Sequence, residues 1–380
     1  MKEQIIKLLK KIVEIKSNYP NELKISKFIL NYFKTQSYHV KKQIVEKNRF
    51  NVLVKKNKIK KSFVLYSHLD TVNIVDGWQT NPLKLTIIKD RAYGLGAWDM
   101  KGGMVANILT FLNFQPKNFN LKLVFCVDEE NISKGAFKLI KSEFLSDANL
   151  VISTEPAFFY GNQGIVIGRP GRAVYNLTIT CNPKHYGFYE KKFDINIFLA
   201  EIIKELSKFY KKSNQKKQFI FVRKISSKTI GMSTPYEIDL ELDSSILPPL
   251  TNNQLKSKIE NKLQLINKKF NNYFKFNLTY FKRKTPFLEG YELKKNNLYL
   301  KILKKSILNI TGKKAIPYFR SSIADENIFG SNKIPILGIG PEGANAHSAN
   351  EWVSISSIEK LYNILINFLN SLDRKYDLAR

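Results

Sequence analysis

The sequence has few cysteines, and no apolar run in it approaches the roughly 20 residues that span a bilayer. Its two cysteines, Cys126 and Cys181, lie in strand-like apolar segments, so we expect no disulfide framework and predict a reducing, cytoplasmic environment. Lysines interrupt the apolar pattern of the first 16 residues, which predicts an amphipathic helix and not a signal peptide. We therefore expect a soluble protein without a membrane partner.

Acidic residues are also scarce, with 32 Asp and Glu against 62 Lys and Arg, which gives a formal net charge of +30. Such a charge raises the possibility of a nucleic-acid or anionic-membrane partner. The lysines, however, are spread along the whole chain, without an arginine-rich tract or a zinc-finger pattern. This distribution favours a solvated lysine surface over a nucleic-acid site. It is also consistent with a field that attracts anionic substrates.

The order of predicted elements indicates two domains in the 380 residues. Helix-like and strand-like segments alternate in 1–168 and again in 285–380, which predicts an α/β domain with a mostly parallel sheet covered by helices. Between them, 169–284 has the order strand, helix, strand, strand, helix, strand, which predicts a ferredoxin-like α+β insertion.

Three of the four histidines, His68, His185 and His347, lie in short motifs with carboxylates and glycines. Each of four such motifs follows a predicted strand, and open α/β sheets bind ligands at the carboxyl ends of their strands. A fifth motif, GLGAWDMKGG, offers Asp99 from a glycine-rich loop before a helix. Nitrogen and oxygen donors without thiolate predict a divalent-metal site. The four motifs are SHLD at 67–70, DEE at 128–130, EP at 155–156 and AHS at 346–348.

Each motif alone has a simpler interpretation. A histidine after a strand is commonly a packed or capping residue, and a DEE triplet is commonly a solvated turn. The glycine-rich loop is also similar to a dinucleotide-binding loop, but Asp99 stands where the third glycine belongs and would repel a pyrophosphate. The occurrence of five motifs at matching positions favours one shared site.

Taken in order, SHLDTV, GLGAWDMKGG, DEE, TEP and AHSANEWV resemble the motifs of a zinc aminoacylase and exopeptidase family. That family includes acetylornithine deacetylase, succinyl-diaminopimelate desuccinylase and glutamate carboxypeptidase. The resemblance implies two Zn²⁺ ions, with Co²⁺ or Mn²⁺ as alternatives. It implies that His68 and Glu155 hold one ion, that Glu130 and His347 hold the other, and that Asp99 bridges the pair.

The resemblance also assigns roles around the metals. Glu129 matches the general base, and Asp70 matches the carboxylate that orients His68. The peptide bond between Asp99 and Met100 is expected to be cis, as it typically is in this family.

Two further residues are assigned by the resemblance to substrate contacts. His185, in the 169–284 insertion, matches a lid-domain histidine that reaches the active site of a partner subunit, so the insertion is expected to be a lid and dimerisation domain in a homodimer. A surface-loop histidine is the alternative. Arg320 precedes a stretch similar to the substrate-side loop of the family and is a candidate clamp for a substrate carboxylate, with a surface salt bridge as the alternative.

Some positions depart from the family pattern. Ser67, Asn73 and Leu95 replace a common glycine, proline and arginine, all outside the expected ligand set. Ser245 stands where many relatives carry arginine, which puts any role of that arginine in doubt.

The expected function is hydrolysis of the amide bond of an N-acyl amino acid or a short peptide. The alternatives are a noncatalytic nucleic-acid-binding protein on this fold and a metal-free homologue that acts as a scaffold. The acyl group and the amino-acid specificity do not follow from the motifs.

Overall fold

The computed structural model describes residues 1–156 and 158–377 and divides into two compact units. The first unit contains Met1–Ile167, Leu293–Tyr318 and Ala324–Arg380, and the second contains Gly168–Glu292 and Phe319–Ile323. The insertion was expected at 169–284. The second unit begins one residue earlier, ends eight residues later, and also contains the short segment Phe319–Ile323.

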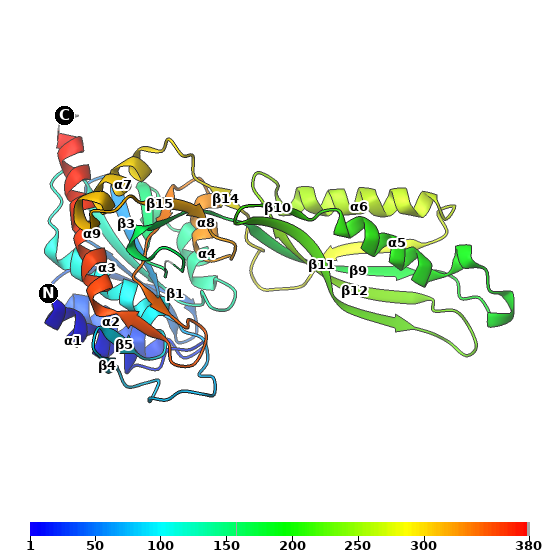
Figure 1. Cartoon of the computed structure of the whole chain (residues 1–380), viewed down its shortest axis with the longest axis horizontal. Coiled ribbons are helices and arrows are strands. Elements are labelled where there is room, and N and C mark those ends of the chain that lie inside the picture. Colours follow the sequence, from blue (N-terminus) through cyan, green and yellow to red (C-terminus); the bar gives the residue numbers. More distant parts are fainter. Residues whose placement is uncertain (157, 378–380) are drawn as a thin grey trace. The chain divides into compact units, whose positions relative to one another are not determined.

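The first unit alternates strands and helices (Figure 1). Its strands, of which β8 and β15 end in the second unit, are β1 (His39–Glu46), β2 (Arg49–Lys55), β3 (Ser62–His68), β4 (Thr86–Ile88), β5 (Arg91–Tyr93), β6 (Asn120–Cys126), β7 (Ala148–Ser153), β8 (Gly164–Arg169), β15 (Ile316–Phe319), β16 (Ile336–Gly338), β17 (Gly343–Ala344) and β18 (Trp352–Ser354). Its helices are α1 (Lys2–Val13), α2 (Leu23–Lys34), η1 (Ala97–Gly102), α3 (Gly103–Asn113), α4 (Lys134–Ile140), η2 (Glu143–Leu145), η3 (Gly161–Gln163), α7 (Leu298–Thr311), α8 (Glu326–Ser331) and α9 (Ile355–Asp377).

The central sheet of the first unit has the order β1-β2-β6-β3-β7-β16-β8. Its three middle pairings, β6 with β3, β3 with β7 and β7 with β16, are parallel. The pairings toward both edges, β1 with β2, β2 with β6 and β16 with β8, are antiparallel. The predicted α/β class is confirmed, and the parallel part is the centre of the sheet. The carboxyl ends of β3, β6, β7 and β16 therefore meet at one edge.

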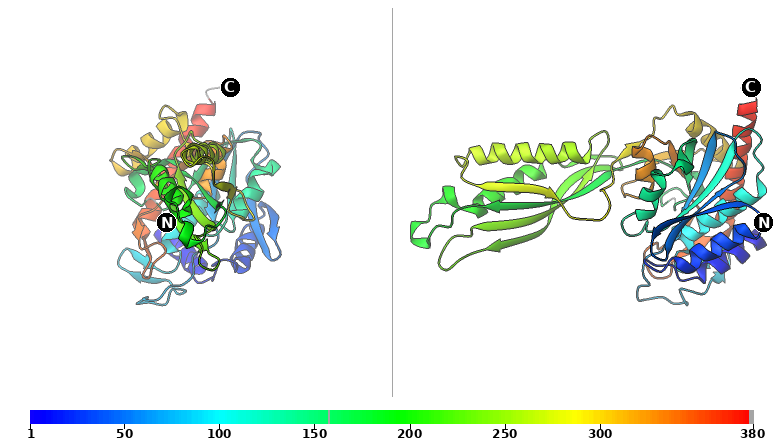
Figure 2. Two further views of the ribbon diagram at one scale, coloured as in Figure 1. Left: turned by 90° about the vertical axis from the view of Figure 1, so that its right-hand side faces the viewer. Right: turned by 180° about the vertical axis from the view of Figure 1, so that it is seen from behind.

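Helices cover both faces of this sheet. Helices α1, α2, α3 and α9 lie on the same face (Figures 1 and 2), and one large apolar cluster, which also includes residues of α7, joins them to the sheet. The central strands are fully buried, because β3 and β6 expose none of their seven residues. Short helices α4 and α8 contact each other on the opposite face. A rigid, water-excluding sheet thus supports the loops that follow its strands.

Sequence patterns did not reveal every element of the first unit. They missed the β1–β2 hairpin and a separate four-stranded sheet in the order β17-β18-β5-β4. The strands of that small sheet have only two or three residues each, which is too short for a readable period. Helix α7 begins at Leu298, where the Asn297 side chain accepts hydrogen bonds from the backbone N–H groups of Tyr299 and Leu300.

The second unit is an antiparallel sheet with two long helices on one face (Figure 1). The strand order β10-β11-β12-β9-β13 confirms the predicted ferredoxin-like arrangement, with β10 as an added edge strand. Its elements are β9 (Gly171–Thr180), η4 (Tyr186–Phe188), η5 (Lys191–Phe193), α5 (Ile195–Ser207), β10 (Lys211–Ser213), β11 (Lys216–Lys228), β12 (Glu237–Ile246), α6 (Asn252–Lys268), β13 (Lys275–Tyr280) and β14 (Tyr291–Glu292).

No helix in the described ranges, 1–156 and 158–377, is long and apolar enough to cross a membrane.

Candidate metal centre

His68 is the last residue of β3, and its imidazole is fully buried. Its Nδ1 atom lies 2.9 Å from the backbone oxygen of Asp70, and because a carbonyl oxygen only accepts, Nδ1 is the donor. Its Nε2 atom lies 3.3 Å from Oδ1 of Asp99 and 3.2 Å from Oε1 of Glu155. In the neutral imidazole, the Nε2 lone pair therefore faces two carboxylates, which is the arrangement of a metal-binding histidine.

Asp70 differs in detail from the sequence-based expectation. Its carboxylate lies 3.8 Å from Nδ1 of His68, so the nearer acceptor for that ring is the backbone oxygen of Asp70. The carboxylate instead accepts a hydrogen bond of 2.8 Å from the backbone N–H of Glu130. Burial raises the pKa of Asp70 to about 8. Asp70 thus links the end of β3 to the loop that carries Glu129 and Glu130.

Asp99 lies in η1, the short helical turn before α3. The peptide bond between Asp99 and Met100 is cis, which confirms the expectation for this bond. The two carboxylate oxygens of Asp99 face different histidines, Oδ1 at 3.3 Å from Nε2 of His68 and Oδ2 at 3.3 Å from Nε2 of His347. Burial acts to raise the pKa of Asp99, but hydrogen bonds to His347 and His68 outweigh it and hold the pKa below its ordinary value.

His347 and Glu130 lie on the other side of Asp99. Nε2 of His347 is 3.0 Å from Oε1 of Glu130, and hydrogen bonds to Asp99 and Glu130 raise the pKa of His347 to about 11. His347 has a positive φ of 62° and follows β16 and β17 in a loop. The nearby carboxylates that favour a proton on this imidazole also favour a metal cation beside it.

The donor atoms form two overlapping groups that fit a pair of cations. One group is His68, Asp99 and Glu155, and the other is Asp99, Glu130 and His347. Within each group, one nitrogen or oxygen atom per residue lies within 4.8 Å of the others. Asp99 belongs to both groups, so it is placed to bridge two ions. The structure brings all five predicted ligands together, and their role as ligands stays a prediction.

Glu129 lies beside the same cluster, in a third group with His68 and Glu130. Its Oε1 atom accepts a hydrogen bond of 3.3 Å from the backbone N–H of Asp325. Burial, and then the nearby charge of Glu155, raises the pKa of Glu129 well above its ordinary value. A carboxylate in this position is chemically suited to accept a proton from a water molecule and to return it.

His185 and Arg320 belong to the second unit, whereas the cluster belongs to the first. The Nδ1 atom of His185 accepts a hydrogen bond of 3.3 Å from the backbone N–H of Gly187, and its ring lies 4.7 Å from that of Tyr186. Arg320 is buried, and its backbone N–H donates to the oxygen of Gly168. The roles of both residues at the site stay predictions.

Sequence patterns missed Glu351 as a member of the site. This residue is 1% exposed, and its carboxylate accepts hydrogen bonds of 2.7, 2.9 and 2.8 Å from the backbone N–H groups of Gly96, Trp98 and Asp99. It therefore fixes the loop that carries Asp99. The only signal in the sequence was its place at the end of the motif that contains His347.

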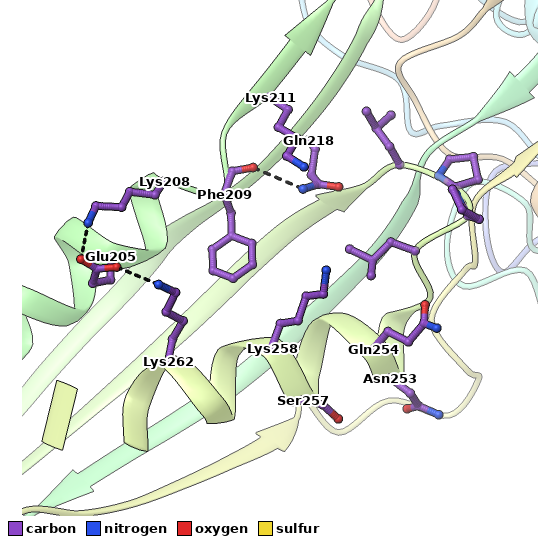
Figure 3. A pocket seen from close by; sticks show the side chains of 14 residues that line it. Glu205, Lys208, Phe209, Lys211, Gln218, Asn253, Gln254, Ser257, Lys258 and Lys262 are labelled. Atoms are coloured by element: carbon purple, nitrogen blue, oxygen red, sulfur yellow. Dashed lines mark hydrogen bonds and ion pairs between the residues drawn. The ribbon is translucent and has the colours of Figure 1, made fainter. Parts of the chain in front are cut away.

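The second unit contains a separate pocket of about 1100 Å³ with a basic lining. Four lysines line it, and the carboxylate of Glu205 pairs with two of them, Lys208 and Lys262 (Figure 3). Lys211 and Lys258 are the other two. None of the candidate metal groups found among the described residues includes a residue of this pocket.

A family model described as peptidase family M20/M25/M40 matches residues 64–371. The acetylornithine deacetylase of Buchnera aphidicola subsp. Acyrthosiphon pisum is 24% identical over 355 residues, which cover 90% of this chain and 88% of that protein. A probable succinyl-diaminopimelate desuccinylase of Staphylococcus aureus is 28% identical over 185 residues, 45% of this chain. The latter match spans about half of the relative, 46% of its length.

Solved structures of low sequence identity share the fold. A tripeptidase from Staphylococcus aureus matches with a TM-score of 0.77 and 20% identity over 98% of this chain and 99% of the other. A Bacillus subtilis protein described as a dinuclear metal binding peptidase from the M20 family matches with a TM-score of 0.75 and 12% identity over 98% of both chains.

Proposed function

The chain belongs to peptidase family M20/M25/M40, a family of hydrolytic enzymes, and we propose that it is a two-metal hydrolase that cleaves an amide bond. The observation that carries this proposal is the position of Asp99, whose two carboxylate oxygens face His68 and His347 at 3.3 Å each. A carboxylate between two histidine–carboxylate groups is what a bridged pair of divalent cations requires.

The donor set favours Zn²⁺, with Co²⁺ or Mn²⁺ as alternatives, because it combines imidazole nitrogen and carboxylate oxygen without thiolate. His68 and Glu155 would hold one ion, and His347 and Glu130 the other. Ions bound there would polarise the substrate carbonyl and lower the pKa of a water molecule.

Glu129 is the general base in this proposal. Its carboxylate takes a proton from the attacking water and passes it to the leaving nitrogen, so that the amine departs neutral. The backbone N–H of Asp325 holds Oε1 of Glu129 in place. The raised pKa of Glu129 favours uptake of the proton from water. Glu130, the next residue, is bound to Asp70 through its backbone N–H, so adjacent glutamates keep separate roles.

The proposed substrate is a small N-acyl amino acid or a short peptide, most of which are anionic. The names of the relatives support this class, since they include a deacetylase, a desuccinylase and a tripeptidase. Arg320 is the proposed clamp for a substrate carboxylate, and the net charge of +30 favours the approach of anions. His185 of a homodimer would reach the centre of the other subunit and bind the developing oxyanion.

A substrate panel tests the proposal. The protein loaded with Zn²⁺, Co²⁺ or Mn²⁺ would be incubated with N-acetylornithine, N-succinyl-diaminopimelate, dipeptides and tripeptides, each with a free or an amidated carboxylate, and the released amine would be measured. We expect turnover of at least one substrate and slower turnover of its amidated form. Absence of hydrolysis with every metal, together with salt-dependent binding to duplex nucleic acid, would instead support the noncatalytic alternative.

A further inference from the structure

A buried network of charged side chains contacts the loop that carries Glu129. It consists of Arg49 at the start of β2, Glu22 before α2, and Asp128 in the loop after β6. Arg49 is 4% exposed, and Glu22 and Asp128 are fully buried. These residues come from three separate parts of the first unit and have no place in the metal cluster.

The guanidinium of Arg49 is bonded at every nitrogen. Nε donates to Glu22 at 2.9 Å, Nη2 donates to both Glu22 and Asp128, the latter at 2.6 Å, and Nη1 donates to Glu46 at 2.7 Å. The ring of Tyr19 lies 4.6 Å from the centre of the guanidinium. This planar fork, with fixed bonds to three carboxylates at once, is a geometry that lysine cannot reproduce.

Asp128 directly precedes Glu129 in the chain, so the bonds that fix Asp128 also restrict the position of Glu129. The backbone of Asp128 has φ +77°, a left-handed conformation that is uncommon for a residue with a side chain. Its carboxylate also accepts from the backbone N–H of Lys134 at 3.0 Å and from Asn131 at 3.2 Å, and its carbonyl accepts from Ser133 at 2.7 Å. The whole turn that presents Glu129 is therefore organised around one side chain.

Stability alone does not explain such a network. A buried group of ions often contributes no more to stability than apolar residues of the same size would, because desolvation offsets the attraction. Its position suggests another role. We propose that Arg49, acting through Asp128, is a positioning residue that holds Glu129 in place for proton transfer. This inference rests on the proposed function, because it assumes that Glu129 is the base.

The test compares Arg49→Lys and Asp128→Asn with a matched control, Arg172→Lys. Arg172 also makes a two-pronged pair, with Asp243 at 3.0 and 2.6 Å, but it lies in the second unit. On whichever panel substrate is turned over, we expect the Arg49 and Asp128 variants to lose about 10- to 100-fold in kcat. We expect their KM and metal content to be unchanged, and the Arg172 variant to keep wild-type kcat.

The double variant Arg49→Lys with Asp128→Asn separates a shared role from two independent ones. If Arg49 acts through Asp128, the double variant loses no more kcat than the more damaged single variant. If the kcat loss of the double variant equals the product of the two single losses, the inference is overturned. Recovery of kcat on addition of excess Zn²⁺ would also overturn it, because the defect would then lie in metal binding. Thermal unfolding of each variant shows that folded protein is compared.

Glu129→Gln distinguishes failure of this inference from failure of the proposed function. If Glu129→Gln keeps activity, the base assignment itself is wrong. If it is inactive while Arg49→Lys and Asp128→Asn keep wild-type kcat, only the positioning role is wrong.

Discussion

The two halves of the candidate metal centre differ in their exposure to solvent. On one side, the imidazole of His68 is 0% exposed at the end of a central strand, whereas on the other side that of His347 is 53% exposed in a loop. The carboxylates on both sides, Glu155 and Glu130, are nearly buried. One half thus lies at the buried edge of the central sheet, and the other is open to solvent.

This difference indicates that the two halves have different roles although their donor groups are similar. The buried half is preorganised, because a strand and its backbone contacts fix the ring of His68. In the open half, the ring of His347 is half exposed, so we expect an ion held there to exchange more readily than one held by His68. Each prediction below would either sharpen this contrast or remove it.

The largest effect is expected for Glu129, which lies within reach of both halves. Glu129→Gln should lower kcat by about 10²- to 10⁴-fold, because the amide cannot accept the proton, while both metal ions remain bound. In the wild type, kcat/KM should fall as pH falls, since Glu129 acts when unprotonated, and burial moves this loss toward neutral pH. Steady-state kinetics and metal analysis check both points, and unchanged kcat would remove Glu129 from the mechanism.

Replacement of His68 and of His347 should have different effects on the stability of the metal-free protein. His68→Ala removes a buried ring that contacts two carboxylates, so the metal-free protein should lose about 1–3 kcal/mol of its free energy of unfolding. His347→Ala removes a half-exposed ring, whose ion pairs with Asp99 and Glu130 are weakened by solvent, and should lower that free energy by less than His68→Ala does. Each variant should bind one ion fewer. Urea unfolding and metal analysis measure these quantities, and equal destabilisation by both substitutions would contradict the contrast.

Removal of metal should proceed in two steps. A chromogenic chelator should take the ion of the open half first and that of the buried half more slowly. The thermal midpoint should fall with each step, because ligands of the folded state stabilise it by mass action. The His347→Ala variant should lack the fast step. A single release phase for two ions in the wild type would show that the halves are equivalent.

The smallest effect on stability is expected for His185, an exposed residue of the second unit. His185→Ala should leave the thermal midpoint and the metal content unchanged, yet lower kcat if this side chain serves the centre of a partner subunit. Mixing it with an inactive Glu129→Gln protein should then restore part of the activity, because a mixed dimer combines one intact centre with one intact His185. No recovery in verified mixed dimers would argue against a shared site.

The proximity of His68, Glu130, Glu155 and His347 was predictable because strand ends are readable, whereas their assignment as ligands, and that of Asp99, came from the family resemblance and stays a prediction. An apolar run marks each central strand, and parallel strands bring their following residues to one edge. The supporting contacts were not readable. Glu351 and Arg49 act on loops about 250 and 80 residues away in the chain, and no periodicity links such partners. The closest contact of His68 was also missed, because it is made by the backbone of Asp70 and leaves no trace in residue identity.

The position of Glu351 in the chain has a consequence for the order in which the centre forms. The loop with Asp99 is made early in synthesis, but the carboxylate that binds its three N–H groups comes more than 250 residues later, next to His347. If a pair of ions binds as proposed, a ribosome-bound chain that ends before these residues cannot complete the bridge between them. Uptake of both ions would then depend on residues from the last tenth of the polypeptide.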